Sequence, residues 1–219
     1  MSKIRFLSLL LLAAMLAFPV FAADEEEEKE SAEKFEFSSD KTSIELSKGK
    51  EMTVLEGNAR ILSGQTLINA NRIELFGENF RYALCSGQVR VRDSKQGIYL
   101  KCENLFFDRE KKISRIEEYA EMVDKKNNLV VKGNFLEDSQ ESETTIIQIG
   151  VRIIKDNIVC RSEAAVYNRK TKELELSSSP YVIKDGDEYR ATRIIINIDT
   201  DEIRLEGRVR GTIQQEESA

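Results

Sequence analysis

From about Ser43 onward, apolar and polar residues alternate with a period of two, which is typical of β-strands that bury one face. Short runs of Ile, Val, Leu, Phe and Tyr are broken by Gly, Asn and Asp, which favour turns. No stretch of ten or more residues has a clean helical period of 3.6. The sequence therefore predicts an all-β protein, with strands at 53–62, 66–76, 81–92, 97–108, 113–123, 129–137, 144–155, 157–168, 173–177, 180–184, 189–199 and 202–213.

Two phrases recur along the chain. Gly57-Asn-Ala-Arg-Ile61 returns as Gly87-Gln-Val-Arg-Val91, with weaker echoes that begin at residues 118, 149, 179 and 207, so the period is about 30 residues. Between these phrases, Lys101–Arg109 matches Arg161–Arg169. A unit of this size holds two antiparallel strands and two turns. Stacking five or six such units predicts an elongated body with a continuous apolar inner stripe and an unpaired strand edge at each end.

The period of two also assigns residues to the inner face. The candidate inner residues of the first phrase, beside Ala59 and Ala120, are Ile61, Val89, Val91, Met122, Val151, Ile153, Tyr181, Ile183 and Val209. Those of the second phrase, beside Tyr167, are Ile73, Leu75, Leu105, Phe107, Phe135, Ile194 and Ile196. The same residues would fill a closed sandwich core or line a groove between splayed sheets, and the pattern alone does not separate the two.

The first residues have the features of a secretory signal peptide. Lys3 and Arg5 precede an apolar run of about 13 residues, shorter than the ~20 that span a bilayer, and the small-residue site Val20-Phe21-Ala22 follows. We expect a signal peptide over residues 1–22 and an acidic disordered leader over 23–42. The β-domain is then expected over 43–213 and a tail over 214–219. Such a chain would be exported to the periplasm.

Composition excludes several kinds of chemistry. The chain has no histidine, so a Ser-His-Asp triad and imidazole metal ligands are absent, and we expect no cofactor, no metal site and no catalytic residue. Without Lys3 and Arg5, 31 basic residues face 39 acidic ones, and a net charge near −8 argues against nucleic acid as a partner. Cys85, Cys102 and Cys160 are expected to be small buried residues, with a Cys85–Cys102 or Cys102–Cys160 disulfide as the alternative.

The charged residues within the repeats can be explained either by structure, as turn residues or surface charge, or by binding of a ligand. Two carboxylate groups, Asp185-Gly-Asp187 and Asp199–Glu202, fall where hairpin turns are expected. Eight basic residues could contact phosphate groups of a ligand or be ordinary surface charge: Arg60, Arg90, Arg92, Lys101, Arg152, Arg161, Arg190 and Arg193.

The order and period of the two phrases behind a signal peptide resemble the OstA-like (LptA) family of lipopolysaccharide export. The resemblance covers roughly residues 43–213. It implies a V-shaped antiparallel β-jelly roll whose inner residues form a groove that shields acyl chains. It also implies head-to-tail docking of the terminal strands onto inner-membrane and outer-membrane export components that carry the same domain.

We therefore expect a non-enzymatic periplasmic protein that carries or bridges lipopolysaccharide, or a related amphipathic envelope lipid, from the inner to the outer membrane. One alternative is a scaffold that binds no lipid and forms a head-to-tail homo-oligomer through its end strands. Another is a β-helical enzyme acting on polysaccharide, for which paired carboxylates in one cleft would be required.

Overall fold

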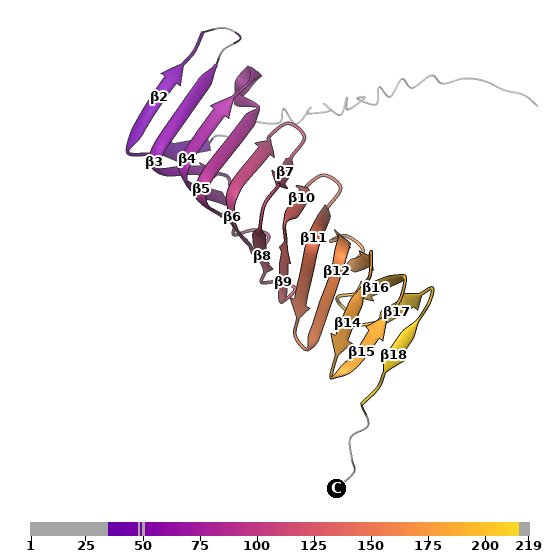
Figure 1. The fold of residues 1–219 in the computed structure, drawn as a ribbon. Helices are drawn as coiled ribbons and strands as arrows, with labels where there is room; N and C mark the ends of the chain where they lie inside the picture. Colours follow the sequence, from indigo (N-terminus) through magenta and orange to yellow (C-terminus); the bar gives the residue numbers. More distant parts are fainter. Residues whose placement is uncertain (1–34, 48, 50, 215–219) are drawn as a thin grey trace, which may run out of the picture. The chain divides into compact units, whose positions relative to one another are not determined.

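The computed structural model describes residues 35–47, 49 and 51–214, all within one structural unit, Glu33–Ala219. Antiparallel strands dominate these residues, and neighbouring strands along the chain lie side by side (Figure 1). The strands are β1 Phe35–Ser38, β2 Lys41–Glu45, β3 Met52–Ser63, β4 Thr66–Phe76, β5 Tyr82–Asp93, β6 Ile98–Asp108, β7 Ile113–Ile116, β8 Ala120–Asp124, β9 Leu129–Gly133, β10 Phe135–Ser139, β11 Thr144–Lys155, β12 Ile158–Asn168, β13 Glu173–Ser177, β14 Tyr181–Lys184, β15 Asp187–Arg190, β16 Arg193–Asn197, β17 Ile203–Glu206 and β18 Arg210–Thr212. A 3₁₀ turn, η1 Glu78–Phe80, links β4 to β5.

Strand pairing divides the sheet into two layers, because each long strand pairs with different neighbours at its two ends. In β6, residues 98–102 pair with β8, whereas residues 106–108 pair with β7. Layer A contains β1, β8, β9, β14, β15 and β18 with residues 59–63, 66–70, 89–93, 98–102, 151–155 and 158–162. Layer B contains β2, β7, β10, β13, β16 and β17 with residues 52–56, 72–76, 82–86, 104–108, 144–148 and 164–168.

At five of its six described crossings from layer B to layer A, the chain turns at a corner with two consecutive residues of positive φ, and the β7–β8 crossing is the exception. At Gly57 and Asn58 these angles are 71° and 46°, and at Gly87 and Gln88 they are 77° and 52°. Register shifts in β3, β5 and β11 fall at these corners, as expected for β-bulges that bend a strand. Further pairs are Ile149 and Gly150, Ser178 and Ser179, and Gly207 and Arg208. The first recurring phrase of the sequence is therefore the corner itself.

The second phrase supplies the residues that cover these corners on the adjacent strand. The residues at the corresponding positions are Asp40, Asn71, Glu103, Asn134, Glu163 and Thr192. The backbone amide of Asp40 donates to the Gly57 carbonyl over 2.8 Å, and the Glu163 carboxylate accepts from the Gly150 amide over 3.2 Å. The Thr192 amide likewise donates to the Gly207 carbonyl over 2.8 Å. These bonds satisfy backbone groups that the bulge removes from the regular ladder.

The structure confirms the all-β, antiparallel class built from two-strand units. Strands β4, β11 and β13 have the expected bounds, whereas the runs expected at 113–123, 129–137, 189–199 and 202–213 are each interrupted at a corner. The disordered leader extends too far, because its residues 35–38 form β1, which pairs with β3. The remaining expected leader residues up to 34, the signal peptide 1–22 and tail residues 215–219 lie outside the described residues. In the described ranges no helix has the length and apolar character needed to cross a membrane.

We predict that Gly87→Ala is more destabilising than Gly97→Ala, although both glycines have φ of +77°. The left-handed backbone should cost each variant about 1 kcal/mol. A Cβ at Gly87 would also lie 2.6 Å from Nδ2 of Asn71, whereas one at Gly97 would meet the flexible Lys126 side chain at 3.1 Å. Urea unfolding should give an additional loss of about 1–3 kcal/mol for Gly87→Ala. Equal losses in the two variants would show that the contact with Asn71 does not constrain the corner.

Candidate lipid-binding core

Inward side chains of each layer form rows that continue in register from strand to strand. The layer A row is Ile61, Ile68, Val91, Leu100, Met122, Val131, Ile153, Cys160, Val182 and Tyr189. The layer B row is Leu55, Ile73, Cys85 and Leu105, continued by Ile116, Leu136, Ile147, Ala165, Leu176, Ile194 and Leu205. Both rows contribute to one hydrophobic cluster, so the interior between the layers is apolar along the strand order.

Most of the predicted inner residues lie in this cluster. Those that are buried are Ile61, Ile73, Leu75, Val89, Leu105, Met122, Val151, Ile153, Ile194 and Ile196. Val91 and Phe107 are half-buried and pack against the cluster. Their inward orientation is confirmed, whereas their contact with lipid remains a prediction.

For four residues the predicted assignment to the inner face is wrong, because the alternation of inner and outer positions restarts at each corner. Phe135 follows the corner residue Asn134, and its neighbour Leu136 is the buried one, at 1% exposure. In β14 the buried residue is Val182, at 0%, so Tyr181 and Ile183 point to the opposite face. Val209 follows the Gly207–Arg208 corner and is 52% exposed. The alternation restarts after each corner. Counting inner positions from the corners would have identified Leu136 and Val182 as the buried residues.

The interior is closed in this structure. Leu55, Ile73, Val131, Ile147 and Leu176 are all at 0% exposure. Side chains covered to this degree contact other protein groups rather than an open groove. An acyl chain could reach them only if layers A and B separate.

Polar groups enter the interior near the layer B turns. Thr145 is fully buried, its hydroxyl donates to Oδ1 of Asp138 over 2.5 Å, and Arg169 donates to the same hydroxyl over 2.7 Å. Tyr167 is 1% exposed, and its hydroxyl has no hydrogen-bond partner among the described residues. Burial, with a smaller effect of Asp124, raises the pKa of Tyr167, so the hydroxyl stays neutral.

The three cysteines are free thiols in the described structure. Cys85 and Cys160 are buried, as the sequence predicted, whereas Cys102 is only half-buried. Burial raises the pKa of each thiol to about 12, with a further contribution from Glu103 at Cys102. These thiols are therefore structural rather than reactive.

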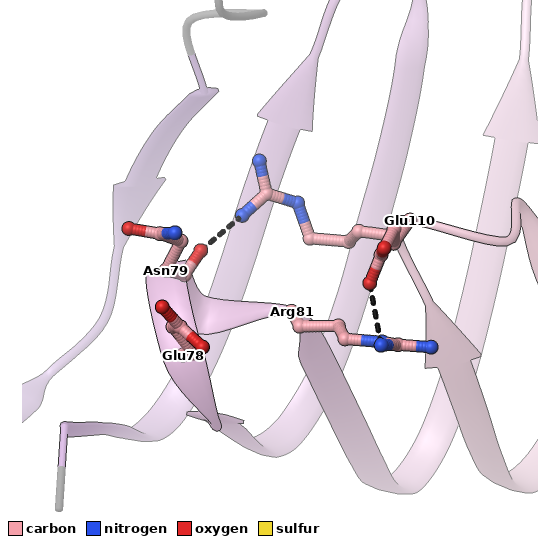
Figure 2. Close-up of a pocket in the computed structure, with 5 residues that line it drawn as sticks. Glu78, Asn79, Arg81 and Glu110 are labelled. Carbon is pink, nitrogen blue, oxygen red and sulfur yellow. Dashed lines mark hydrogen bonds and ion pairs between the residues drawn. The ribbon is translucent and has the colours of Figure 1, made fainter. Parts of the chain in front are cut away.

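The pocket drawn in Figure 2 is polar and its charged groups hold one another in place. Arg81 donates to both carboxylate oxygens of Asp108, over 3.1 and 2.9 Å, and pairs with Glu110 at 2.5 Å. Arg109 donates to the carbonyl oxygen of Phe80 over 3.1 Å. The hydrogen bonds from Arg81 hold the pKa of Asp108 below its usual range. This arrangement fixes the η1 turn against the β6–β7 turn.

The carboxylate groups singled out in the sequence lie in or beside turns, with Asp187 at the start of β15. Asp187 accepts from the Tyr189 hydroxyl over 3.1 Å and from the Gln214 amide over 2.9 Å, and Asp201 pairs with Nζ of Lys155 at 2.7 Å. Within the described ranges no cluster of Cys, Asp and Glu has the arrangement of a metal site.

Thiol accessibility should follow from these pKa values. We expect a disulfide-exchange reagent at pH 8 to label none of the three cysteines quickly in the native protein and all three after unfolding. A thiol with a pKa of about 12 is almost entirely protonated at pH 8, and the thiolate is the attacking species. Raising the pH should accelerate native labelling. Rapid labelling of one thiol at pH 8 would contradict its burial.

Tyr167→Phe should raise the free energy of unfolding by about 1 kcal/mol, because it removes a buried hydroxyl that has no partner. Thr145→Val is the contrasting change, since it deletes a buried hydroxyl bonded to Asp138 and Arg169 and should lower stability. Chemical denaturation of both variants measures the difference. A loss of stability in Tyr167→Phe would mean that the hydroxyl is bonded in solution.

Comparisons with known proteins identify a family that this chain matches. Residues 36–202 match the family model described as LptA/(LptD N-terminal domain) LPS transport protein. Among solved structures, the chain is similar to LptH from Pseudomonas aeruginosa, described as the LptA homologous periplasmic component of the conserved lipopolysaccharide transport device. That alignment has 10% identity and a TM-score of 0.26, and it covers 84% of this chain and 96% of LptH. No curated protein sequence matches the chain.

The family match covers most of the chain, since 167 of its 219 residues lie between 36 and 202. It extends from β1 into the turn before β17, so it includes every corner except Gly207–Arg208 and both inward rows except Leu205. The family that matches is one of transport proteins rather than enzymes. The chain belongs to the LptA/LptD N-terminal domain family of lipopolysaccharide transport proteins.

Proposed function

We propose that this protein is a periplasmic bridge that holds the acyl chains of lipopolysaccharide between layers A and B while the lipid passes toward the outer membrane. The observation that carries the proposal is the pair of apolar rows, which continue in register across the strands. Burial of apolar surface stabilises a complex by about 25 cal/mol per Å², so several acyl chains would bind without directed polar contacts. The family match supports lipopolysaccharide as the lipid.

Loading requires the layers to part, because the inward side chains are covered by protein. Acyl chains would then replace contacts between the two rows, and the exchange of one apolar neighbour for another has a small net free energy. In β3, β5 and β11 the corners connect the layers through bulges, where the hydrogen-bond ladder shifts register. They are therefore the positions at which the angle between the layers can change. Similar side chains along each row would let a lipid move between equivalent positions.

The terminal strands support end-to-end docking. In the described structure β1 and β2 pair only with β3, and β17 and β18 pair only with β16 and β15. Such edges can accept a strand from another protein. Six of the ten exposed large hydrophobic residues described lie at these two ends: Phe37, Ile44, Leu46, Met52, Val209 and Ile213. The partners would be inner- and outer-membrane export components that carry the same domain, or a second copy of this chain.

Photocrosslinking at two neighbouring positions of β16 tests lipid binding. Ile194 points into the interior and is 0% exposed, whereas Ile195 is 6% exposed and lies between Glu175 and Arg204 on the other face. A small diazirine side chain at Ile194 should give a lipopolysaccharide adduct in cells, and the same probe at Ile195 should not. Circular dichroism of both variants checks folding.

A second pair of probes separates transport from a scaffold. Probes at Ile44 and Ile213, both exposed at the ends, should crosslink protein partners in either case. Protein adducts at the ends without a lipid adduct at Ile194 would favour the scaffold and contradict the lipid bridge.

A further inference from the structure

The outer face of layer A has a row of basic residues that crosses successive strands. Directly opposed residues follow one another in register as Arg60, Asn69, Arg90, Lys101, Glu121, Lys132, Arg152, Arg161, Tyr181, Arg190 and Arg210. Opposed residues point to the same side of a sheet, so these side chains form one line. The line contains eight cations and one acid, Glu121, which pairs with Lys132 at 2.8 Å. We call it the basic row.

Ion pairs do not neutralise the basic row. Among the described residues, seven of its eight cations take part in none of the ion pairs found. Four cross-strand pairs place cation opposite cation, which is unfavourable without a counter-charge: Arg90 with Lys101, Lys132 with Arg152, Arg152 with Arg161, and Arg190 with Arg210. The nearest acids on the corner side, Glu103 and Glu163, accept hydrogen bonds from corner amides.

The outer face of layer B has the opposite arrangement. Arg115 pairs with Glu137 at 2.6 Å, and Arg204 pairs with Glu173 at 3.0 Å. Arg193 bridges Glu175 and Glu206 at 2.6 and 2.8 Å. The concentration of unpaired cations is thus a property of layer A rather than of exposed strands in general.

A second row on the same face of layer A is mostly apolar. Two residues further along each strand, the register continues through Leu62, Leu67, Arg92, Tyr99, Val123, Val130, Ile154, Val159 and Ile183. The row ends in acids, Glu36 opposite Leu62 and Glu188 opposite Ile183. Between these acids the side chains are half-buried, apart from the exposed Arg92, although they lie on the face opposite the core. A line of cations therefore runs beside a line of partly exposed aliphatic and aromatic groups.

We propose that the outer face of layer A binds the surface of an anionic phospholipid bilayer. Cations beside apolar side chains match the boundary between phosphate groups and acyl chains, where amphipathic protein surfaces bind. A soluble polyanion would be recognised by the cations alone and would gain nothing from the apolar row. Because sheets twist, a flat bilayer contacts only neighbouring strands at one time. Arg152 and Arg161 on the paired strands β11 and β12, beside Ile154 and Val159, form one such block.

Vesicle co-sedimentation tests the proposal with the purified protein. Wild type should bind vesicles that contain phosphatidylglycerol, should not bind phosphatidylcholine vesicles, and should be released by high salt. The double variant Arg152→Gln/Arg161→Gln should bind about thirtyfold more weakly, since each cation near an anionic surface contributes roughly fivefold. The matched control, Arg115→Gln/Arg204→Gln, removes the same charge from layer B and should retain binding. Equal losses in the two double variants would overturn the proposal.

A third variant distinguishes a bilayer from a soluble polyanion. Ile154→Ser should weaken binding to the anionic vesicles and leave binding of inorganic polyphosphate unchanged. If Ile154→Ser binds the vesicles as wild type does, the apolar row has no role and the ligand is a polyanion, which contradicts the proposal. These vesicles contain no lipopolysaccharide, so the result is independent of crosslinking at Ile194. The substituted cations are exposed, and circular dichroism should be unchanged.

Discussion

The corner between the two layers is the constraint on which the rest of the structure depends. At five of the six described passages from layer B to layer A, two consecutive residues adopt positive φ, as Gly87 and Gln88 do. The bulge removes backbone groups from the ladder, and a polar residue of the adjacent strand, such as Glu103, bonds them again. Without these corners the long strands would continue in one sheet, and the two apolar rows would not meet in one cluster.

The corner also explains how much the sequence could predict. Alternation of period two and the two recurring phrases were enough to predict the fold class and most of the long strands. They were not enough for β10 and β14, because a corner shifts the phase and exchanges the faces of Phe135 and Leu136. Pairing across strands was also hidden, since the register that aligns Arg152 with Arg161 depends on the turn between them. The basic row is therefore visible only once the strands are paired.

A closed interior is compatible with a transport family because of the nature of its contacts. Apolar contacts have little directionality, so under the proposed function the residues that pack layer A against layer B would pack against acyl chains instead. A catalytic cleft would need polar groups fixed in the empty state, whereas an acyl binding site needs only surface that can be uncovered. The Tyr167 hydroxyl differs from the buried Thr145 hydroxyl in having no hydrogen-bond partner among the described residues.

Net charge is a poor guide to the partners of a layered β-protein. The chain is acidic overall, with 39 acidic and 33 basic residues, and this average argues against anionic ligands. In a sheet built from repeats, however, equivalent residues of successive strands lie opposite one another. A basic residue at one position of the repeat therefore gives a continuous line of cations across the strands. Layer B pairs its cations with acids, as Arg193 does with Glu175, whereas layer A leaves Arg152 and Arg161 side by side. The local arrangement of charges along the basic row, rather than the total charge, therefore determines what this row attracts.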